Sequence, residues 1–301
     1  MSASAAVTLE QAVATATSRL AEAGIEAPRR DARLLVCSLL GGGPELLLAR
    51  PERPLDAAET AGIAAAVERR ARREPISRIL GRREFWSLEF QLGPETLDPR
   101  PDSETLVEAV LDFIPRRDAE LRILDLGCGS GCLLLALLSE LPVAQGLGID
   151  LAPGAVAASA ENARRLGLGS RAEFVQGSWQ DGLQGVWNIV VSNPPYIPTA
   201  EIAGLAPEVA AYDPPLALDG GTDGLAAYRS LIPAAAAVLH GEGLLALEVG
   251  AGQSAAVRGL LEEAGFPTIR VARDLSGIER CVLATQARKS RASAQELADV
   301  R

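Results

Sequence analysis

The sequence is poor in the side chains that build metal centres and disulfide frameworks. Its 301 residues include one histidine, His240, and four scattered cysteines, Cys37, Cys128, Cys132 and Cys281. Cys128 and Cys132 are four positions apart, but no second pair accompanies them, so we expect no metal site. Few, scattered thiols in a chain of this length are typical of reduced cysteines in a cytoplasm. We expect His240 to be a plain turn residue before a strand.

Long hydrophobic runs and an excess of positive charge are also missing. No stretch of about 18 uncharged apolar residues is present, so we expect no membrane span, and residues 1–11 lack the features of a secretory signal. The net charge is −10, and the residues after position 85 carry 16 basic against 28 acidic side chains. This balance argues against a stable complex with nucleic acid. Apolar content is 48%, enough for a large core in one or two domains.

A short apolar run, residues 187–191, ends in Ser-Asn-Pro-Pro-Tyr. Its β-branched residues and lack of helical period predict a buried strand, which the two prolines must end. The Asn193 side chain and the Pro194 carbonyl offer two acceptors, Pro195 fixes the direction of that carbonyl, and Tyr196 adds a flat aromatic face. Two converging acceptors suit a substrate NH2 group. The simpler alternative is a turn that only ends a strand.

A glycine-rich loop follows an earlier predicted strand, residues 121–126, and opens a helix. Asp150 ends the next predicted strand, 19 residues after Gly131, close to the spacing of an acid that binds ribose hydroxyls. The glycines at 127, 129 and 131 depart from the dinucleotide pattern, so nicotinamide or flavin binding is the weaker alternative. Asp125 and Asp150 together suit a zwitterionic, adenosine-bearing cofactor with a positive sulfonium.

Hydrophobic periodicity predicts two kinds of architecture along the chain. Helices over 8–23, 31–40, 45–49 and 56–73 form a small bundle, and an alternating segment at 84–92 is half of a hairpin. Strands and helices then alternate, which predicts an α/β, doubly wound parallel sheet, with a strand pair at 268–273 and 280–285. The helix at 56–73 ends in an arginine run, either a solvated helix end or a contact patch for an acidic or RNA-containing partner.

These motifs together resemble the release-factor glutamine methyltransferases, the HemK/PrmC family, whose Asn-Pro-Pro-Tyr serves methylation of planar nitrogens. The similarity covers nearly the whole chain after about residue 75. The matching segments are 76–80, 84–90, 99–101, 124–131, Asp150, Trp179, 193–196, 212–214, 217–225 and 274–278. The resemblance implies a Rossmann-like class I methyltransferase sheet, mostly parallel with the last strand antiparallel, beside a small all-helical N-terminal domain. Asp98 departs from the family, which usually has an apolar residue before Pro-Arg-Pro.

The resemblance also implies a domain scheme and roles for single residues. The scheme is a helical substrate-recognition domain at 1–83, a hairpin linker at 84–104, an S-adenosylmethionine-dependent methyltransferase domain at 105–288, and a flexible tail at 289–301. The expected cofactor contacts are Asp125, Gly127, Cys128, Gly129, Ser130, Gly131, Asp150, Trp179 and Asn193. Asn193, Pro194, Pro195 and Tyr196 are expected to clamp the substrate amide, with Asn193, Pro194 and Tyr196 catalytic.

The implied activity is methylation of the glutamine in the Gly-Gly-Gln loop of class-1 peptide chain release factors, with S-adenosyl-L-methionine as methyl donor. We expect a cytoplasmic monomer. The nearest alternative is a glutamine methyltransferase acting on a ribosomal protein. An adenine-N6 methyltransferase would need a basic recognition region, which the acidic second part lacks. A nucleotide-binding scaffold without chemistry would not need both motifs.

Overall fold

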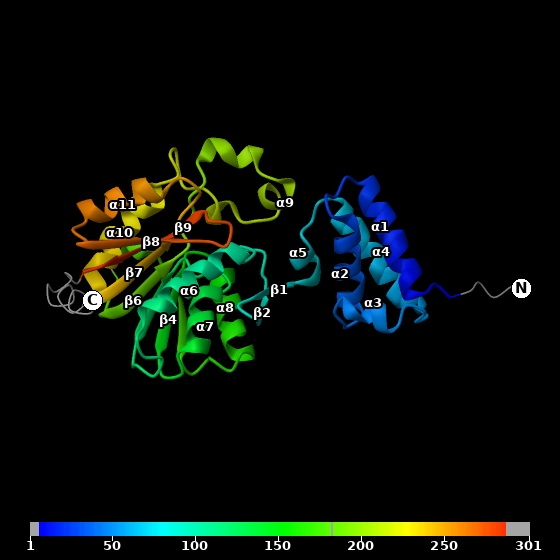
Figure 1. Cartoon of the computed structure of the whole chain (residues 1–301), viewed down its shortest axis with the longest axis horizontal. Coiled ribbons are helices and arrows are strands. Elements are labelled where there is room, and N and C mark those ends of the chain that lie inside the picture. The colour runs from blue at the N-terminus through cyan, green and yellow to red at the C-terminus, as the bar shows by residue number, and fades with distance from the viewer. Residues whose placement is uncertain (1–5, 182, 287–301) are drawn as a thin grey trace, which may run out of the picture. The chain divides into compact units, whose positions relative to one another are not determined.

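The computed structural model describes residues 6–181 and 183–286. These residues form two compact units (Figure 1). The helical unit contains the chain up to Arg82 together with the segment Ala206–Tyr212, and the sheet unit contains Arg83–Leu205 and the chain from Asp213 onward. The proposed domain scheme stays a prediction, and the expected tail at 289–301 lies outside the described residues.

Five helices make up the first part of the helical unit, one more than the sequence predicts. Thr8 and Asp56 begin their helices with capping boxes, in which Gln11 and Glu59 bond back to the cap. The second helix begins earlier than predicted, because Pro28 is acceptable in a first turn. The helices are α1 (Leu9–Glu22), α2 (Pro28–Leu39), α3 (Glu45–Ala49), α4 (Ala57–Ala71) and α5 (Ile76–Leu80). Their inward faces share one apolar core.

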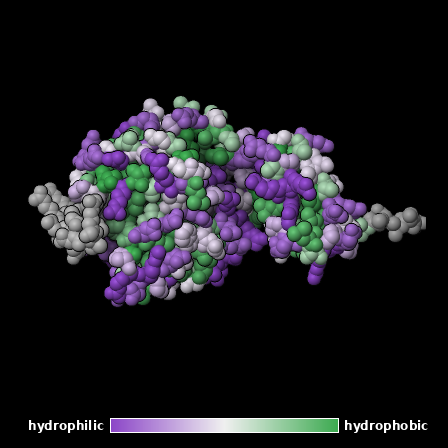
Figure 2. All heavy atoms as spheres, viewed as in Figure 1, coloured by the Kyte–Doolittle hydropathy of each residue, from purple (hydrophilic) through white to green (hydrophobic). Residues whose placement is uncertain are grey.

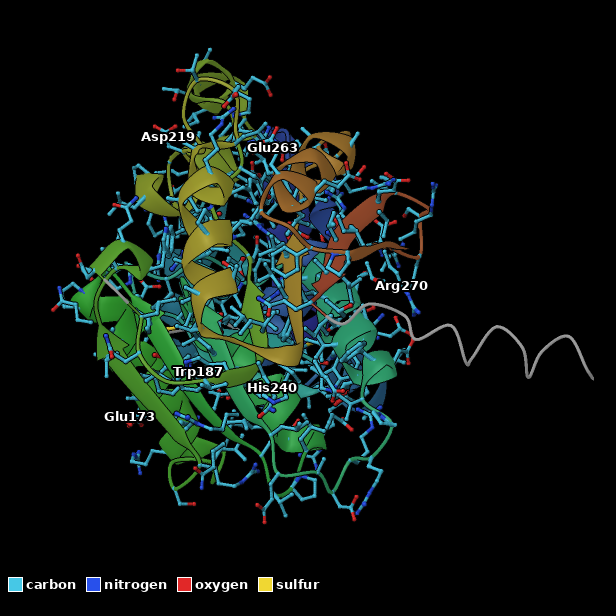
Figure 3. The ribbon with its side chains drawn as sticks, turned by 90° about the vertical axis from the view of Figure 1, so that its left-hand side faces the viewer. Glu173, Trp187, Asp219, His240, Glu263 and Arg270 are labelled. Atoms are coloured by element: carbon cyan, nitrogen blue, oxygen red, sulfur yellow. The ribbon has the colours of Figure 1, made fainter. Side chains whose placement is uncertain are left out.

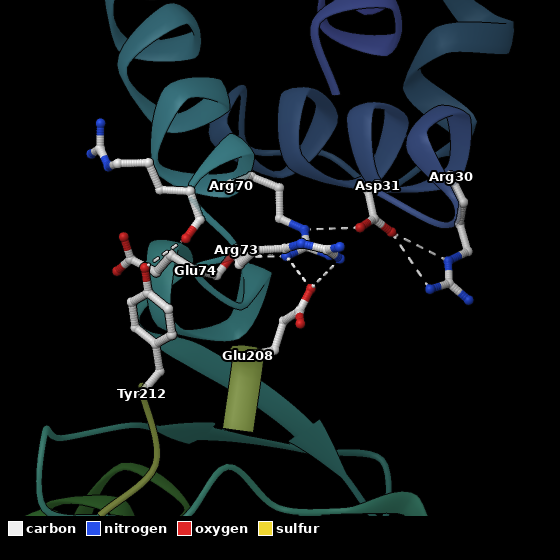
Figure 4. Close-up of polar contacts among 8 residues, drawn as sticks. Arg30, Asp31, Arg70, Arg73, Glu74, Glu208 and Tyr212 are labelled. Atoms are coloured by element: carbon white, nitrogen blue, oxygen red, sulfur yellow. Dashed lines mark hydrogen bonds and ion pairs between the residues drawn. The ribbon is translucent and has the colours of Figure 1, made fainter. Parts of the chain in front are cut away.

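The arginine run at the end of α4 makes ion pairs inside this unit (Figure 4). Arg70 is only 8% exposed, and its Nε lies 3.0 Å from the Asp31 carboxylate on α2. Glu208, on the short helix α9 (Pro207–Ala210), accepts from Arg70 at 3.1 Å and from Arg73 at 3.2 Å. Neither sequence-based interpretation of the run describes this arrangement. The ion pairs of Arg70 and Arg73 therefore connect α4 with α2 and α9.

The sheet unit is a seven-stranded sheet in the order β5-β4-β3-β6-β7-β9-β8. Only β9 runs antiparallel to its neighbours, so the predicted mostly parallel sheet with an antiparallel last strand is confirmed. The strands are β3 (Arg122–Leu126), β4 (Gln145–Asp150), β5 (Ala172–Gln176), β6 (Trp187–Ser192), β7 (Leu239–Glu248), β8 (Thr268–Arg273) and β9 (Glu279–Thr285). A separate hairpin pairs β1 (Arg82–Phe85) with β2 (Leu88–Gln91).

Helices cover both faces of this sheet. One face packs on α6 (Glu104–Phe113), α7 (Cys132–Glu140) and α8 (Pro153–Arg165), and the other on α10 (Ala226–Val238) and α11 (Ser254–Glu263) (Figure 1). Two separate apolar clusters result, one on each face. Within the described residues, no helix is long and apolar enough to cross a membrane. On the face drawn in Figure 2, hydrophilic and hydrophobic residues are interspersed on both units.

Two local predictions about the sheet unit are wrong. β7 begins at Leu239, so His240 is an exposed strand residue and not part of a turn. Figure 3 shows His240 near Trp187, the first residue of β6, and far from Asp219 at the other end of the sheet. The segment 84–92, predicted to be one strand of a hairpin, instead contains parts of both strands, because Trp86 and Ser87 turn the chain with φ angles of 54° and 57°.

Candidate active site

A cavity of about 570 Å³ lies at the carboxyl ends of β3, β4 and β6. Parallel sheets bind ligands at this edge, and the volume is within the usual range for small-molecule sites. The predicted site residues that line it are Gly127, Cys128, Gly129, Ser130, Asp150, Trp179, Asn193, Pro194 and Pro195. The structure therefore brings the glycine loop and the Asn-Pro-Pro turn to one cavity. Asp125, Gly131 and Tyr196 are not part of its lining.

The glycine loop needs its glycines for two different reasons. Gly127, Gly129 and Gly131 have φ angles of 76°, 56° and 78°, which other residues rarely adopt. A side chain at Gly131 would also place its Cβ 2.9 Å from the Cβ of Ser159 on α8. Gly131 thus permits close packing of the helix, whereas Gly127 and Gly129 expose the loop backbone to the cavity.

Asp150 holds the loop and keeps acceptor capacity for a ligand. Its Oδ2 accepts from the Gly129 N–H at 2.8 Å, and its Oδ1 accepts from the Ala152 N–H at 2.9 Å. A carboxylate offers about four lone-pair positions, so both oxygens can accept further hydrogen bonds. The half-buried carboxylate at the cavity fits the hydroxyl groups of a ribose.

Asp125 lies below the loop as a buried acid. It is 0% exposed, and neither carboxylate oxygen has a hydrogen-bond partner among the described residues. Burial raises the pKa of Asp125 to about 7, and the charge of Asp150 acts in the same direction. Because Asp125 does not line the cavity, direct contact with a cofactor stays a prediction.

Trp179 forms a wall beside the loop. A Cβ on Gly127 would lie 3.7 Å from Cζ3 of the Trp179 ring, so the ring faces the loop. The ring nitrogen donates to Ser230 Oγ at 2.9 Å, which holds the half-buried ring in place. A fixed aromatic wall at the cavity fits a planar base, the role expected of Trp179.

The Asn-Pro-Pro-Tyr turn is anchored from both sides. Ser192, just before it, donates from Oγ to the Leu126 carbonyl at 2.5 Å. Asn193 donates from Nδ2 to Ser103 Oγ at 3.2 Å, and the Ser103 side chain makes no capping hydrogen bond with α6. The Tyr196 carbonyl accepts from Gln253 Nε2 at 2.8 Å. These bonds connect the turn to β3, to the start of α6 and to the loop before α11.

Tyr196 turns away from the cavity. Its ring packs against the apolar cluster between the sheet and α10 and α11, and burial raises its pKa to about 12. A Cβ on Gly220 would lie 2.8 Å from the Tyr196 Cα, so this loop approaches the turn closely. In this arrangement Tyr196 supports the turn. The aromatic cover over a substrate amide that the sequence suggests stays a prediction.

Sequence reasoning missed three polar side chains near the turn. Arg100 lines the cavity and donates to Asp213 at 2.5 Å. Ser103 also lines it, beside Asn193, and Glu248 is buried at the end of β7. Glu248 could have been recognised from the sequence, because it is the single charge in the apolar segment 244–249.

Asp98 is the residue that departs from the family pattern. It is buried and lies 3.7 Å from Arg83, so the hairpin supplies a cation for it.

Comparison with known proteins decides the family. Residues 11–81 match the family model of the PrmC N-terminal domain, and residues 102–206 match that of the methyltransferase small domain. The release factor glutamine methyltransferase of Rhodospirillum rubrum is 53% identical over 266 residues, covering 88% of this chain and 81% of that protein. The chain belongs to the release factor glutamine methyltransferase family. The Caulobacter vibrioides member is 46% identical over 278 residues, covering 92% of this chain and 96% of its own.

Solved structures of low sequence identity support the fold. The hMettl16 catalytic domain in complex with MAT2A 3'UTR hairpin 6 has a TM-score of 0.56 at 15% identity, covering 78% of this chain and 84% of that one. The resemblance identified from the motifs is therefore confirmed at the level of family and fold. As a member of this family the chain is a methyltransferase, as predicted. Within the described residues, no group of histidine, cysteine, aspartate and glutamate could hold a metal ion.

Proposed function

We propose that this enzyme uses S-adenosyl-L-methionine to methylate the side-chain amide nitrogen of glutamine in the Gly-Gly-Gln loop of class-1 peptide chain release factors. The observation that carries the proposal is one cavity lined both by the glycine loop with Asp150 and by Asn193 and Pro194. Family members with that name and over 40% identity along most of the chain support the substrate.

The cavity residues fit the proposed cofactor. Asp150 would accept from the ribose hydroxyls, the exposed backbone of Gly127 and Gly129 would receive the amino-acid part, and Trp179 would cover the adenine. When bound, the cofactor supplies a methyl group activated by a sulfonium. Asp125, buried and without a hydrogen-bond partner among the described residues, adds negative potential below the loop where it is ionised, which favours a cationic ligand.

The clamp, formed by Asn193 and Pro194, would promote methylation by orienting the substrate amide. An amide nitrogen is a poor nucleophile, because its lone pair is delocalised into the carbonyl. Asn193 Oδ1 and the Pro194 carbonyl would accept the two N–H groups of the substrate amide and fix the position of its nitrogen. Both acceptors also stabilise the positive charge that develops there. The methylated nitrogen then gives its surplus proton to water, so no strong general base is needed.

The remaining expectations follow from the proposed substrate. We propose that the helical domain, residues 1–83, recognises the release factor, and that the enzyme acts as a cytoplasmic monomer where release factors work. Its acidic balance after residue 85 favours a protein over nucleic acid as the stable partner.

A panel of methyl acceptors tests this function. The purified enzyme, with the Asn193→Ala variant as matched control, is incubated with radiolabelled S-adenosylmethionine and either a class-1 release factor, ribosomal proteins, or bare DNA and RNA. We expect label on the release factor alone, and only with the unsubstituted enzyme. Label on ribosomal protein or nucleic acid, with none on the release factor, would replace the proposal by the corresponding alternative.

A further inference from the structure

Glu248 and Asn193 lie side by side at the ends of adjacent parallel strands. β6 and β7 pair in parallel with Val191 beside Ala246 and Ser192 beside Leu247, so Asn193 and Glu248 directly follow the last paired residues. Side chains alternate between the two faces of a sheet. Because Ala246 belongs to the core on the α6 face, Glu248, the last residue of β7, points to that face too. Asn193 follows β6, and its hydrogen bond with Ser103 places its side chain beside the start of α6.

The carboxylate of Glu248 is part of a buried polar group with Ser103 and Asn193. Glu248 is 1% exposed, and its Oε2 has no hydrogen-bond partner among the described residues. The nearby side chains of Ser103 and Asn193 lower the pKa of Glu248, and Asn193 donates from Nδ2 to Ser103 Oγ at 3.2 Å. A buried carboxyl group with incomplete pairing is unfavourable for folding alone, which points to a functional reason for its presence.

We infer that Glu248 is a positioning residue that sets the orientation of the Asn193 side-chain amide. An ionised carboxylate only accepts hydrogen bonds. A Ser103 hydroxyl that donates to the ionised Glu248 presents only lone pairs to Asn193, so it accepts from Asn193 Nδ2, in agreement with the 3.2 Å contact. Asn193 Oδ1 then remains for the cavity, as the acceptor that the clamp requires. This inference rests on the proposed function and deepens it.

The surroundings make Glu248 the group that changes charge near neutral pH in this cluster. Burial raises its pKa to about 7, and Asp102 acts in the same direction, whereas Ser103, Arg280 and Asn193 lower it. Arg280 is held by ion pairs with Asp102 at 2.9 Å and Asp274 at 3.0 Å. The other facing groups stay neutral, because burial raises their pKa values; they are Tyr196, Tyr228, Cys132 and Cys281.

Ionisation of Glu248 should therefore set the pH dependence of turnover. A raised pKa means that the carboxylate forms only as the pH rises through about 7. Protonated Glu248 can donate a hydrogen bond, so the direction of the Ser103–Asn193 contact is no longer fixed. We expect kcat to rise between about pH 6 and 8. Asp125 has a similar pKa, so a variant must separate the two.

The decisive variant is Glu248→Gln, which keeps the shape but can both donate and accept. The matched control is Glu242→Gln, an exposed glutamate on the same strand. We expect kcat for Glu248→Gln to fall by up to about 100-fold, with little change in cofactor affinity or melting temperature. The rise of kcat with pH should disappear, whereas the control should keep it. An unchanged kcat and pH profile in Glu248→Gln would overturn the inference. If kcat fell but still rose with pH in this variant, the pH dependence would be assigned to Asp125, and the inference would also be overturned.

A measurement without substrate separates this inference from the proposed function. The side-chain NH2 signal of Asn193 is assigned in the nitrogen-15 NMR spectrum by its loss in Asn193→Ala. We expect it to shift with pH around 7 in the unsubstituted protein and not in Glu248→Gln. A signal that does not shift, or shifts equally in both proteins, would overturn the inference even if release factor methylation is found. The expected shift would support it even if the substrate proves different.

Discussion

Replacing Arg70 with methionine should loosen the helical unit far more than the same change at Arg72. Arg70 is 8% exposed and pairs with Asp31, which is 4% exposed, so the substitution leaves a buried carboxylate without its main partner. Breaking a buried pair from one side costs about 3–5 kcal/mol. We expect the free energy of unfolding to fall by about 3 kcal/mol, at the lower end of this range, because two contacts remain. Glu208 keeps its ion pair with Arg73, and Arg30 lies 3.5 Å from Asp31. The Arg30 side chain is exposed, so water screens this second pair. Arg72 is exposed and is the control.

Hydrogen exchange measures this loss where it occurs. Each 1.4 kcal/mol lost from the free energy of unfolding raises the exchange rate about tenfold. Amides of α2 and α4 that exchange by unfolding of the whole unit should therefore exchange about 100-fold faster in Arg70→Met. The double variant Arg70→Met with Asp31→Leu should recover most of the protection, since apolar residues can replace a buried pair. Equal exchange in Arg70→Met and Arg72→Met would refute the reasoning.

Three further predictions concern Asn193, the glycine loop and the four cysteines. Asn193→Ala should lower kcat by at least about 100-fold while circular dichroism shows an intact fold; full activity would remove Asn193 from the clamp. Gly129→Ala should cost about 1–2 kcal/mol for its left-handed backbone, and Gly131→Ala more, because of the contact with Ser159; equal melting temperatures would contradict the packing role. Burial raises the pKa of all four thiols, to about 12 for Cys132. The native protein should therefore react slowly with Ellman's reagent at pH 8, whereas all four thiols should react in urea. Fast reaction of the native thiols would contradict this burial.

The parts of the site that the sequence predicted are those encoded by neighbouring residues. The glycine loop and the Asn-Pro-Pro turn are local: each joins a strand to a turn with residues that allow few other conformations. Asp150 could be placed because the end of one parallel strand lies beside the loop that follows its neighbour. The cavity that unites them follows from the parallel sheet, which periodicity also predicts.

The parts that could not be predicted depend on distant pairing. β9 lies between β7 and β8, and no local pattern states which strand takes the inner position. Ser103 accepts a hydrogen bond from Asn193, 90 positions away, and nothing in the local sequence indicates this contact. From the sequence, Glu208 would be expected to be an ordinary exposed glutamate, whereas in the structure it pairs with Arg70, 138 positions away. The direction of the Tyr196 ring is set by packing under α10 and α11, which the motif does not encode.

The most direct test of the central claim is the position of the methyl group. The enzyme is incubated with S-adenosylmethionine and a class-1 release factor, and in parallel with the same factor carrying alanine in place of the Gly-Gly-Gln glutamine. Peptide mass spectrometry then locates any added methyl group. We predict one methyl group on the side-chain amide of that glutamine and none on the alanine variant. A methyl group elsewhere on the factor, or equal methylation of both proteins, would contradict the account.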